Sequence, residues 1–316
     1  MISNQFTPLP DEHIYSWTAR LFRLSGYPSV SSFLKRYNGS FKNLNANYAF
    51  ESAAFSIIKN SESAEKKQKL LWKNTIFPVS LISIPNQASY SLNNHFNFSE
   101  LSDITHMNEQ LLFGFSRNWH ACSSCMTEDE EKYGMSYWHV EHQLPSVISC
   151  QKHNRILLKP TDGLKNLSTL TLPFLINSWV PIIDKPASSI LEWNNFILKV
   201  HQLSIEDKLF ISRLRCQIND KIKIESKYRN KRIDWCDEHT LSFETALGKS
   251  LLKHLFRAYS VNSKSGKPRI LASFLAPQNN GLLLRNPVYW LALAYWLKTE
   301  LPQLDKVFNY ELSSQF

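Results

Sequence analysis

Four residues of metal-ligand type stand in two short pairs near the middle of the chain. Cys122 and Cys125 form a C-x2-C pair, and Cys150 and His153 form a C-x2-H pair after 24 intervening residues. Each pair places two ligand atoms on one tight turn, and two such turns complete a tetrahedron around one metal ion. Because thiolate and imidazole ligands in this combination suit Zn²⁺ best, the spacing predicts one bound zinc ion.

The predicted zinc site is structural in type. Three thiolates and one imidazole fill four coordination positions, whereas a catalytic zinc keeps one position open for water or substrate. The sequence alone leaves the fourth ligand open, because His120, His139 and His142 lie close enough along the chain to compete with His153.

An enzymatic interpretation rests on the same segment. Zinc deaminases combine an H-x-E motif with a later P-C-x-x-C motif, and His139-Val140-Glu141 supplies the first of these. Here, however, the C-x2-C pair precedes the H-x-E motif, and no proline adjoins it. The chain also lacks a G-x4-GK[ST] loop, a G-x-S-x-G elbow and a G-x-G-x-x-G fingerprint. We therefore expect that the protein is not an enzyme, and a zinc-dependent nucleic-acid enzyme is the remote alternative.

The composition predicts a globular protein of a reducing compartment. Hydrophobic residues make up 43% of the 316 residues, which is enough for a sizeable core. Cys216 and Cys236 belong to no ligand pattern, and the first residues lack the charged and apolar regions of a signal peptide. The longest apolar run, 288–297, is about half as long as a membrane span. We expect a buried helix there, no membrane contact and a cytoplasmic location.

The net charge of +9 arises from one part of the chain. Residues 208–269 carry 15 Lys or Arg against 6 Asp or Glu, whereas the rest balances at 21 of each. A local surplus of this kind is typical of proteins that bind a polyanion, because neutralised phosphates release counterions. We therefore expect double-stranded DNA as a partner; the alternative is a solvated basic surface without a ligand.

Part of this basic region has a helical arrangement. From Phe243 to Tyr259, apolar residues recur every four positions, and Lys249, Lys253 and Arg257 recur two positions out of phase. Two positions correspond to about 200° on a helix, so we expect a helix with one side on the core and a basic side along DNA phosphates. A second cluster lies upstream with weaker periodicity. The predicted DNA-binding residues are Lys221, Lys223, Lys227, Arg229, Lys231, Arg232, Lys249, Lys253, Arg257, Lys264, Lys267 and Arg269.

The N-terminal segment predicts a unit that resembles a helix-turn-helix. Pro10-Asp11-Glu12 would begin a first helix with acidic residues at its positive end, and apolar residues recur with helical spacing over 14–24. Gly26 would end this helix, and Pro28-Ser29 would begin a second one. Arg20 and Arg23 face away from the apolar stripe, so we expect solvated side chains, with DNA contact by this unit as the alternative.

Together these elements predict a mainly helical, multidomain fold with short β-strands around the zinc. We expect an N-terminal helical domain over 1–112, a zinc-binding domain over 113–183 and a basic helical DNA-binding domain over 184–316. The acidic run 128–131 directly follows the first cysteine pair, and its plainest role is to begin a helix.

Taken in order, these features resemble the TnsD/TniQ family of transposition proteins, most closely over residues 8–160. Two departures leave the ligands intact. Ser123 stands where the family commonly has proline, and Asn154 replaces a glycine whose left-handed conformation asparagine can also adopt. The matching stretches are Cys122-Ser-Ser-Cys125, the acidic run, Tyr133-Gly134-Met135-Ser136-Tyr137-Trp138, Gln143-Leu144-Pro145 and Cys150-Gln-Lys-His153.

The resemblance implies a bacterial DNA-binding protein that selects the insertion site of a Tn-seven-like transposon. Such a protein recruits the AAA+ ATPase TnsC, which directs the transposase subunits, and the N-terminal helices are the implied contact for TnsC. The alternative role within the family is an adaptor that links a CRISPR RNA-guided effector complex (Cascade) to TnsC. The family also leaves a homodimer open, although no pattern in this sequence predicts one.

Overall fold

The computed structural model describes residues 7–36, 64–83, 118–161, 170–222, 229–256, 271 and 287–304, and it describes only the backbone at 64, 66, 67 and 229–238. Within these ranges the protein is mainly helical, and the strands β1 (Leu158–Pro160) and β2 (Trp179–Pro181) pair antiparallel in one small sheet. This confirms the predicted fold class of a mainly helical protein with short strands near the cysteine pairs. The division into three domains stays a prediction.

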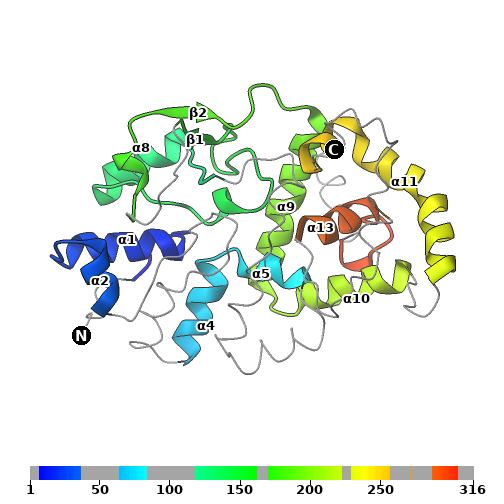
Figure 1. Ribbon diagram of the computed structural model, residues 1–316, viewed down its shortest axis with the longest axis horizontal. Helices are drawn as coiled ribbons and strands as arrows, with labels where there is room; N and C mark the ends of the chain where they lie inside the picture. Colours follow the sequence, from blue (N-terminus) through cyan, green and yellow to red (C-terminus); the bar gives the residue numbers. More distant parts are fainter. Residues whose placement is uncertain are drawn as a thin grey trace, which may run out of the picture.

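The helices form two groups along the long axis of the molecule. In Figure 1, α1, α2 and α8 lie at one end, whereas α10, α11 and α13 lie beyond α9 at the other end. The α-helices are α1 (Ile14–Leu24), α2 (Val30–Arg36), α4 (Ala64–Lys73), α5 (Phe77–Ser80), α8 (Ser123–Tyr133), α9 (Ser188–Glu206), α10 (Phe210–Ile222), α11 (Arg229–Leu255) and α13 (Pro287–Trp296). Short 3-10 helices are η1 (Leu81–Ser83), η2 (Glu141–Gln143) and η4 (Pro173–Leu175).

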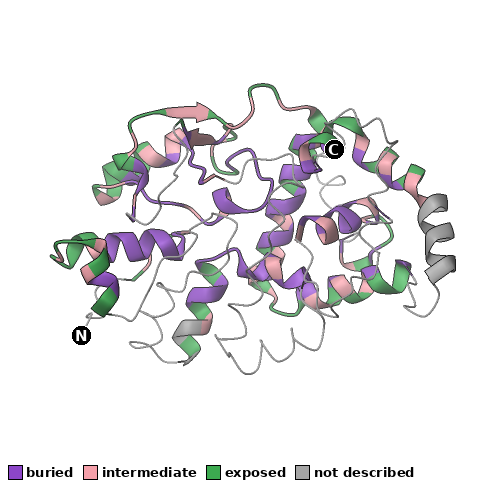
Figure 2. Ribbon diagram, in the orientation of Figure 1, coloured by how far each residue is buried: buried purple, intermediate pink, exposed green. Residues whose placement is uncertain are grey.

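Two hydrophobic cores hold these groups together. The first joins α1 and α2 to Trp119, Trp138 and the segment around Leu172. The second joins α4, α5, η1, α9, α10, α11 and α13, and it also contains the three cysteines of the predicted metal site. Figure 2 shows the buried residues gathered on the inward sides of these elements. The segment that carries the cysteines therefore contributes to both cores.

The first helix begins later than the sequence suggested. Its N-cap is His13, whose Nδ1 accepts a hydrogen bond from the Tyr15 amide at 3.1 Å. The prediction that acidic residues at 10–12 begin the helix was wrong, because Glu12 is fully buried and points at another partner. Gly26 ends the helix region with a φ of 72°, as predicted.

The partner of Glu12 is Arg20, and the prediction of a solvated Arg20 was wrong. Two bonds of 3.1 and 2.9 Å join the guanidinium to the two carboxylate oxygens, and a third of 2.8 Å reaches the carbonyl of Thr7. Burial raises the pKa of Glu12, and the hydrogen bonds and charge of Arg20 oppose that rise. Such a two-pronged charged pair fixes geometry, so it ties the segment before α1 onto the helix itself.

At the other end of the molecule, α9 packs against α11 and α13. The apolar stripe of α9 is buried, and Trp193 and Phe196 both contact the ring of Tyr295 edge-on. The apolar run 288–297 forms the buried helix α13 that the sequence predicted. No helix in the described ranges has the length and apolar character that a membrane span requires.

The C-terminal basic helix differs from its prediction in one respect. Phe243, Leu247, Leu251 and Leu255 are all buried, as their four-residue spacing predicted. Gly248, however, interrupts α11 with a φ of 72° and a ψ of 157°, so the helix bends there into two pieces. This region of backbone space is essentially restricted to glycine. The sequence pattern hid the bend, because the apolar spacing continues across it.

We expect Gly248→Ala to lower the free energy of unfolding by about 1–3 kcal/mol, because a Cβ makes this backbone conformation strained. Beyond the neighbouring residues of the helix itself, no atom of the described residues lies within 4 Å of the position that the Cβ would occupy, so we attribute the cost to the backbone conformation. Denaturant unfolding of the variant measures this cost. Ser250→Ala, an exposed position two residues further on, is the control and should stay within about 0.5 kcal/mol of wild type. Equal stability of Gly248→Ala and wild type would indicate an unbroken helix.

Candidate metal centre

The two ligand pairs lie on different local structures. Cys122 is the N-cap of α8, and Cys125 lies in its first turn. Cys150 and His153 lie on a tight turn closed by bonds from the Cys150 amide to Arg155 (2.9 Å) and from the Asn154 amide to Cys150 (2.9 Å). Asn154 has a φ of 50°, the left-handed conformation that the sequence predicted for it.

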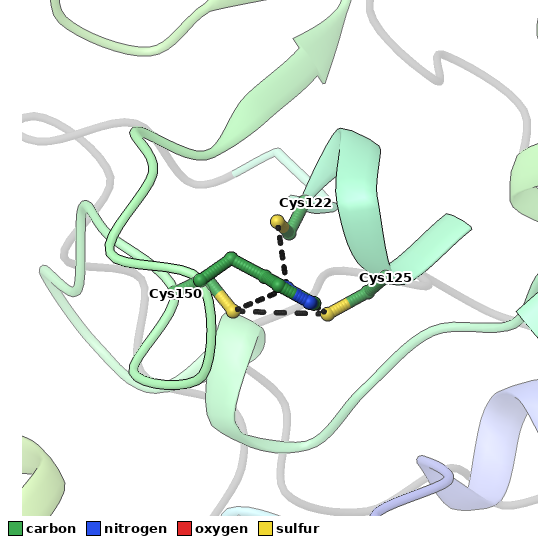
Figure 3. Close-up of side chains that lie close together, drawn as sticks. Cys122, Cys125 and Cys150 are labelled. Carbon is green, nitrogen blue, oxygen red and sulfur yellow. Dashed lines mark hydrogen bonds between the residues drawn. The ribbon is translucent and has the colours of Figure 1, made fainter. Parts of the chain in front are cut away.

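The four ligand atoms of these residues converge on one point. All lie within 4.8 Å of one another, and the sulfur atoms belong to buried side chains. Figure 3 shows the cysteine side chains pointing toward one another from α8 and from the facing loop. Nδ1 of His153 lies 3.6, 3.3 and 3.6 Å from the sulfur atoms of Cys122, Cys125 and Cys150, and the sulfur atoms of Cys125 and Cys150 are 3.7 Å apart.

These separations fit a tetrahedral metal site. With metal–sulfur bonds of about 2.3 Å and metal–nitrogen bonds of about 2.0 Å, the edges of a tetrahedron are about 3.8 Å between sulfur atoms and about 3.5 Å between sulfur and nitrogen. The observed distances lie close to both values. The cluster could therefore hold a metal ion.

Three thiols at this distance cannot all ionise by themselves. The pKa of the Cys122 thiol is lowered, mainly by hydrogen bonds with Cys125 and Cys150. The pKa of the Cys125 thiol is raised, mainly by its hydrogen bonds with Cys122 and Cys150. One thiolate thus suppresses ionisation of its neighbour. A bound cation reverses this relation, because a coordinated thiol is deprotonated.

The competing histidines lie outside the cluster. His139 has both ring nitrogens at carboxylates: Nε2 is 2.9 Å from Asp129 and Nδ1 is 3.4 Å from Asp11. Burial lowers the pKa of His120 to about 4 and favours its neutral form, and this side chain also takes no part in the cluster. Nε2 of His142 lies 3.9 Å from the sulfur of Cys125, but the ring is outside the group of four.

This arrangement bears on the deaminase interpretation. The histidine of its H-x-E motif would have to join two cysteines at the metal. His139 is instead held between Asp11 and Asp129, and the backbone amide of Glu141 donates to Asp11 at 3.3 Å. The geometry of the described residues therefore does not favour a deaminase site.

The acidic run 128–131 has a different place from the one predicted. α8 begins at Ser123 and has no acidic residue in its first turn, so the prediction that the run begins the helix was wrong. Oε1 of Glu128 lies 2.8 Å from Nε2 of His153, and Glu128 also pairs with Lys152. Asp129 bonds His139, and Glu130 accepts a 2.9 Å bond from Ser136. The sequence carried no signal for these contacts, because each partner lies outside α8 and the helical repeat of the sequence does not predict it.

Backbone bonds attach the N-terminal segment to this site. The amide of Val140 donates to the carbonyl of Asp11 at 2.8 Å, and that of His13 donates to the carbonyl of Trp138 at 2.8 Å. His139 lies in the middle of this pairing, stacked on Tyr137 at 4.5 Å. Burial lowers its pKa, but hydrogen bonds to Asp11 and Asp129 outweigh burial and raise the pKa to about 9. His139 is thus a charged link between the N-terminal segment and α8.

A second set of contacts attaches the loop before Cys150 to the C-terminal helices. Oδ1 of Asn194, on α9, accepts bonds from the amides of Ile148 (2.8 Å) and Ser149 (3.0 Å). Ser146 accepts a 2.7 Å bond from the indole of Trp193, and its carbonyl accepts a 3.3 Å bond from His254 on α11. Sequence reasoning missed Asn194 and His254, since neither stands in a motif.

The structure describes the side chains of only some of the predicted DNA-binding residues. Lys249 and Lys253 are exposed beside the buried Leu251 and Leu252, whereas Lys221 is exposed and pairs with Glu300 at 3.4 Å. For three residues of α11 only the backbone is described: Arg229, Lys231 and Arg232. The remaining predictions lie outside the described residues: Lys223, Lys227, Arg257, Lys264, Lys267 and Arg269.

The fold and the site define a mainly helical protein with a cluster of three cysteines and one histidine that could hold a metal ion. Residues 5–157 match the family model for TniQ. This part of the chain, which includes α1, α2 and the whole cluster, is thus similar to the TniQ family, and the match supports a transposition-associated protein. A search of curated proteins found no match.

We expect the His139 link to make stability depend on pH. A histidine whose folded pKa is about 9, above the ordinary 6.5, contributes stability that is complete below pH 6.5 and is lost as pH rises through 9. The shift corresponds to roughly 3 kcal/mol. The difference in unfolding free energy between wild type and His139→Gln should therefore shrink by about that amount between pH 6 and pH 9.5. Glu131→Gln, an exposed position on α8, should keep the wild-type profile; a constant difference for His139→Gln would contradict the link.

Proposed function

We propose that this protein is a target-site selector of a Tn-seven-like transposon, which binds double-stranded DNA at the insertion site and recruits the AAA+ ATPase TnsC. The observation that carries the proposal is the TniQ match over residues 5–157, which spans the N-terminal helices and the metal cluster. In this role TnsC directs the transposase subunits, and the protein itself acts by binding and not as an enzyme.

The C-terminal half is the proposed contact for DNA. Its positive charge surplus is concentrated in 208–269, and on α11 Lys249 and Lys253 are exposed while Leu251 and Leu252 beside them are buried. Both lysines follow the bend at Gly248, one helical turn apart, so they present two positive charges along one side of a short helix. Two charges at this spacing suit adjacent phosphates of a backbone, and such contacts position a protein on DNA without reading its sequence.

The α1–α2 unit is the proposed contact for TnsC, and this assignment rests on the family resemblance. The unit lies at the opposite end of the molecule from α11 (Figure 1). Its exposed surface includes Leu24, which is 53% exposed, and Arg23, which lies over the ring of the exposed Phe174. A protein with DNA at one end and the ATPase at the other would act as a bridge.

The proposed metal is one structural Zn²⁺, held by Cys122, Cys125, Cys150 and His153. Three sulfur atoms and one imidazole nitrogen match the ligands that zinc prefers, and they fill its four positions. The cysteines are also buried in the second core. When bound, the ion would join α8 to the loop of Cys150 and contribute to folding, and no open position would remain for substrate.

We expect Cys150→Ser to lose zinc and stability together, because a structural site contributes folding free energy directly. Loss of a metal belongs to the changes that cost more than about 4 kcal/mol. Native mass spectrometry gives the metal stoichiometry, and thermal unfolding gives the stability. Cys216→Ser is the control, since Cys216 is exposed and lies outside the cluster. A Cys150→Ser variant that stays folded with one zinc would show that the ligand set is wrong.

The proposed function is tested by selecting bound fragments from a sheared genomic library with the zinc-loaded protein. At about physiological salt, sequence-blind phosphate binding is weak, so we expect one enriched sequence. Lys253→Glu should reduce recovery and flatten the dependence of affinity on salt, because a phosphate contact is lost. Lys132→Glu makes the same charge change on α8, at the other end of the molecule, and should behave as wild type.

Two outcomes would revise the proposal. Salt-sensitive binding without an enriched sequence would favour the alternative role, an adaptor that links a CRISPR effector complex (Cascade) to TnsC. If Lys253→Glu bound like wild type while an enriched sequence was found, DNA contact would have to lie elsewhere on the chain.

A further inference from the structure

His153 makes two kinds of contact at once. Its Nδ1 faces the three sulfur atoms at 3.3–3.6 Å. Its Nε2, on the opposite side of the ring, lies 2.8 Å from Oε1 of Glu128. The imidazole therefore bridges the metal cluster and a carboxylate that is not itself part of the cluster.

This geometry requires one tautomer of the ring. A neutral imidazole that offers the lone pair of Nδ1 to a metal carries its hydrogen on Nε2. An ionised carboxylate only accepts hydrogen bonds, so Glu128 favours the form in which Nε2 donates. With that bond made, Nδ1 is left free toward the sulfur atoms, and the ring cannot rotate without breaking it.

The position of Glu128 follows from α8. Cys122, Cys125 and Glu128 stand three residues apart in sequence, so they lie along one side of the helix. The helix thereby supplies one thiol from its N-cap, a second from its first turn and a carboxylate one turn later. Lys152, the neighbour of His153, contacts the same carboxylate from the facing loop, so Glu128 is held from two directions.

We propose that Glu128 is a positioning residue of the metal site, which orients His153 and fixes its tautomer and thereby sets the affinity for zinc. The inference rests on the proposed zinc site and assigns a role to a residue outside the ligand set. Carboxylates that accept from the far nitrogen of a metal-bound histidine change metal affinity by about 10- to 100-fold when they are removed. Because Glu128 is 46% exposed, solvent screens part of its charge and places the effect near the lower end.

The test measures zinc affinity by competition with a chromophoric chelator. Glu128→Ala removes the acceptor, and we expect about 10-fold weaker binding. Glu128→Gln keeps an amide oxygen that can accept the same bond without the charge, so its loss should be smaller. The matched control is Glu131→Ala, which removes an exposed carboxylate from the same helix and should bind zinc within about twofold of wild type.

A second readout separates positioning from a general effect on α8. Long-range ¹H–¹⁵N spectra of the histidine rings report which nitrogen of His153 binds the metal. We expect coordination through Nδ1 in wild type and Glu131→Ala, and a mixture of Nδ1 and Nε2 coordination in Glu128→Ala. A helix that was merely destabilised would lower the melting temperature and leave the ring signals unchanged, and that result would overturn the inference. If Glu128→Ala does not fold, Glu128→Gln tests the same contact, with a smaller loss of zinc affinity relative to Glu131→Ala as the expected result.

The outcomes also separate this inference from the zinc site itself. Wild-type protein that binds no zinc would overturn both. Wild-type protein that binds one zinc, with Glu128→Ala as tight as Glu131→Ala, would overturn the role of Glu128 and leave the ligand set intact.

Discussion

The structure depends on the meeting of three thiols and one imidazole at a single point. Two of the thiols belong to the N-cap and the first turn of α8, and the other two ligands belong to a loop that begins after 24 intervening residues. Thiols at this distance oppose one another's ionisation, as the opposite pKa shifts of Cys122 and Cys125 indicate. A bound divalent cation would deprotonate the coordinating thiols and attract the resulting thiolates, so their mutual repulsion would be offset. The cysteines are also part of the second core, so a metal ion bound here would couple metal binding to packing.

The acidic residues of α8 connect the cluster to its surroundings. Successive residues of a helix point about 100° apart, so Glu128, Asp129 and Glu130 reach three different neighbours: His153 of the cluster, His139 and Ser136. Through His139 and Asp11, α8 also contacts the segment that precedes α1. The buried pair of Glu12 and Arg20 then attaches this segment to α1. The orientation of the N-terminal helices is therefore linked, contact by contact, to the helix that carries half of the metal site.

Sequence reasoning succeeded where a feature is local. The cysteine spacing, the left-handed Asn154 and the buried stripes of α9 and α11 each depend on residues within a few positions of one another. It failed where a partner comes from elsewhere in the fold. A helical wheel places Arg20 on the polar side of α1, and only the folded chain shows that Glu12 turns back to meet it. The acidic run is ambiguous for the same reason, since its partners lie on other turns and loops. Gly248 escaped notice because glycine is compatible both with a helix and with the bend that the chain makes there.

For a protein proposed to bridge DNA and an ATPase, the connection between its ends matters as much as the ends themselves. The loop of 146–149 leads directly into Cys150, and it is held by Asn194 and Trp193 of α9 and by His254 of α11. His254 follows Lys253 on the same short helix, so a residue proposed to contact DNA adjoins one that contacts the loop before the metal site. The metal site in turn adjoins His139 and the N-terminal unit. A continuous series of buried and partly buried contacts of this kind resists relative movement better than a linker would, because each buried polar group that lost its partner would cost free energy. The proposed bridge would thus present its two ends at a fixed separation, with the metal cluster between them.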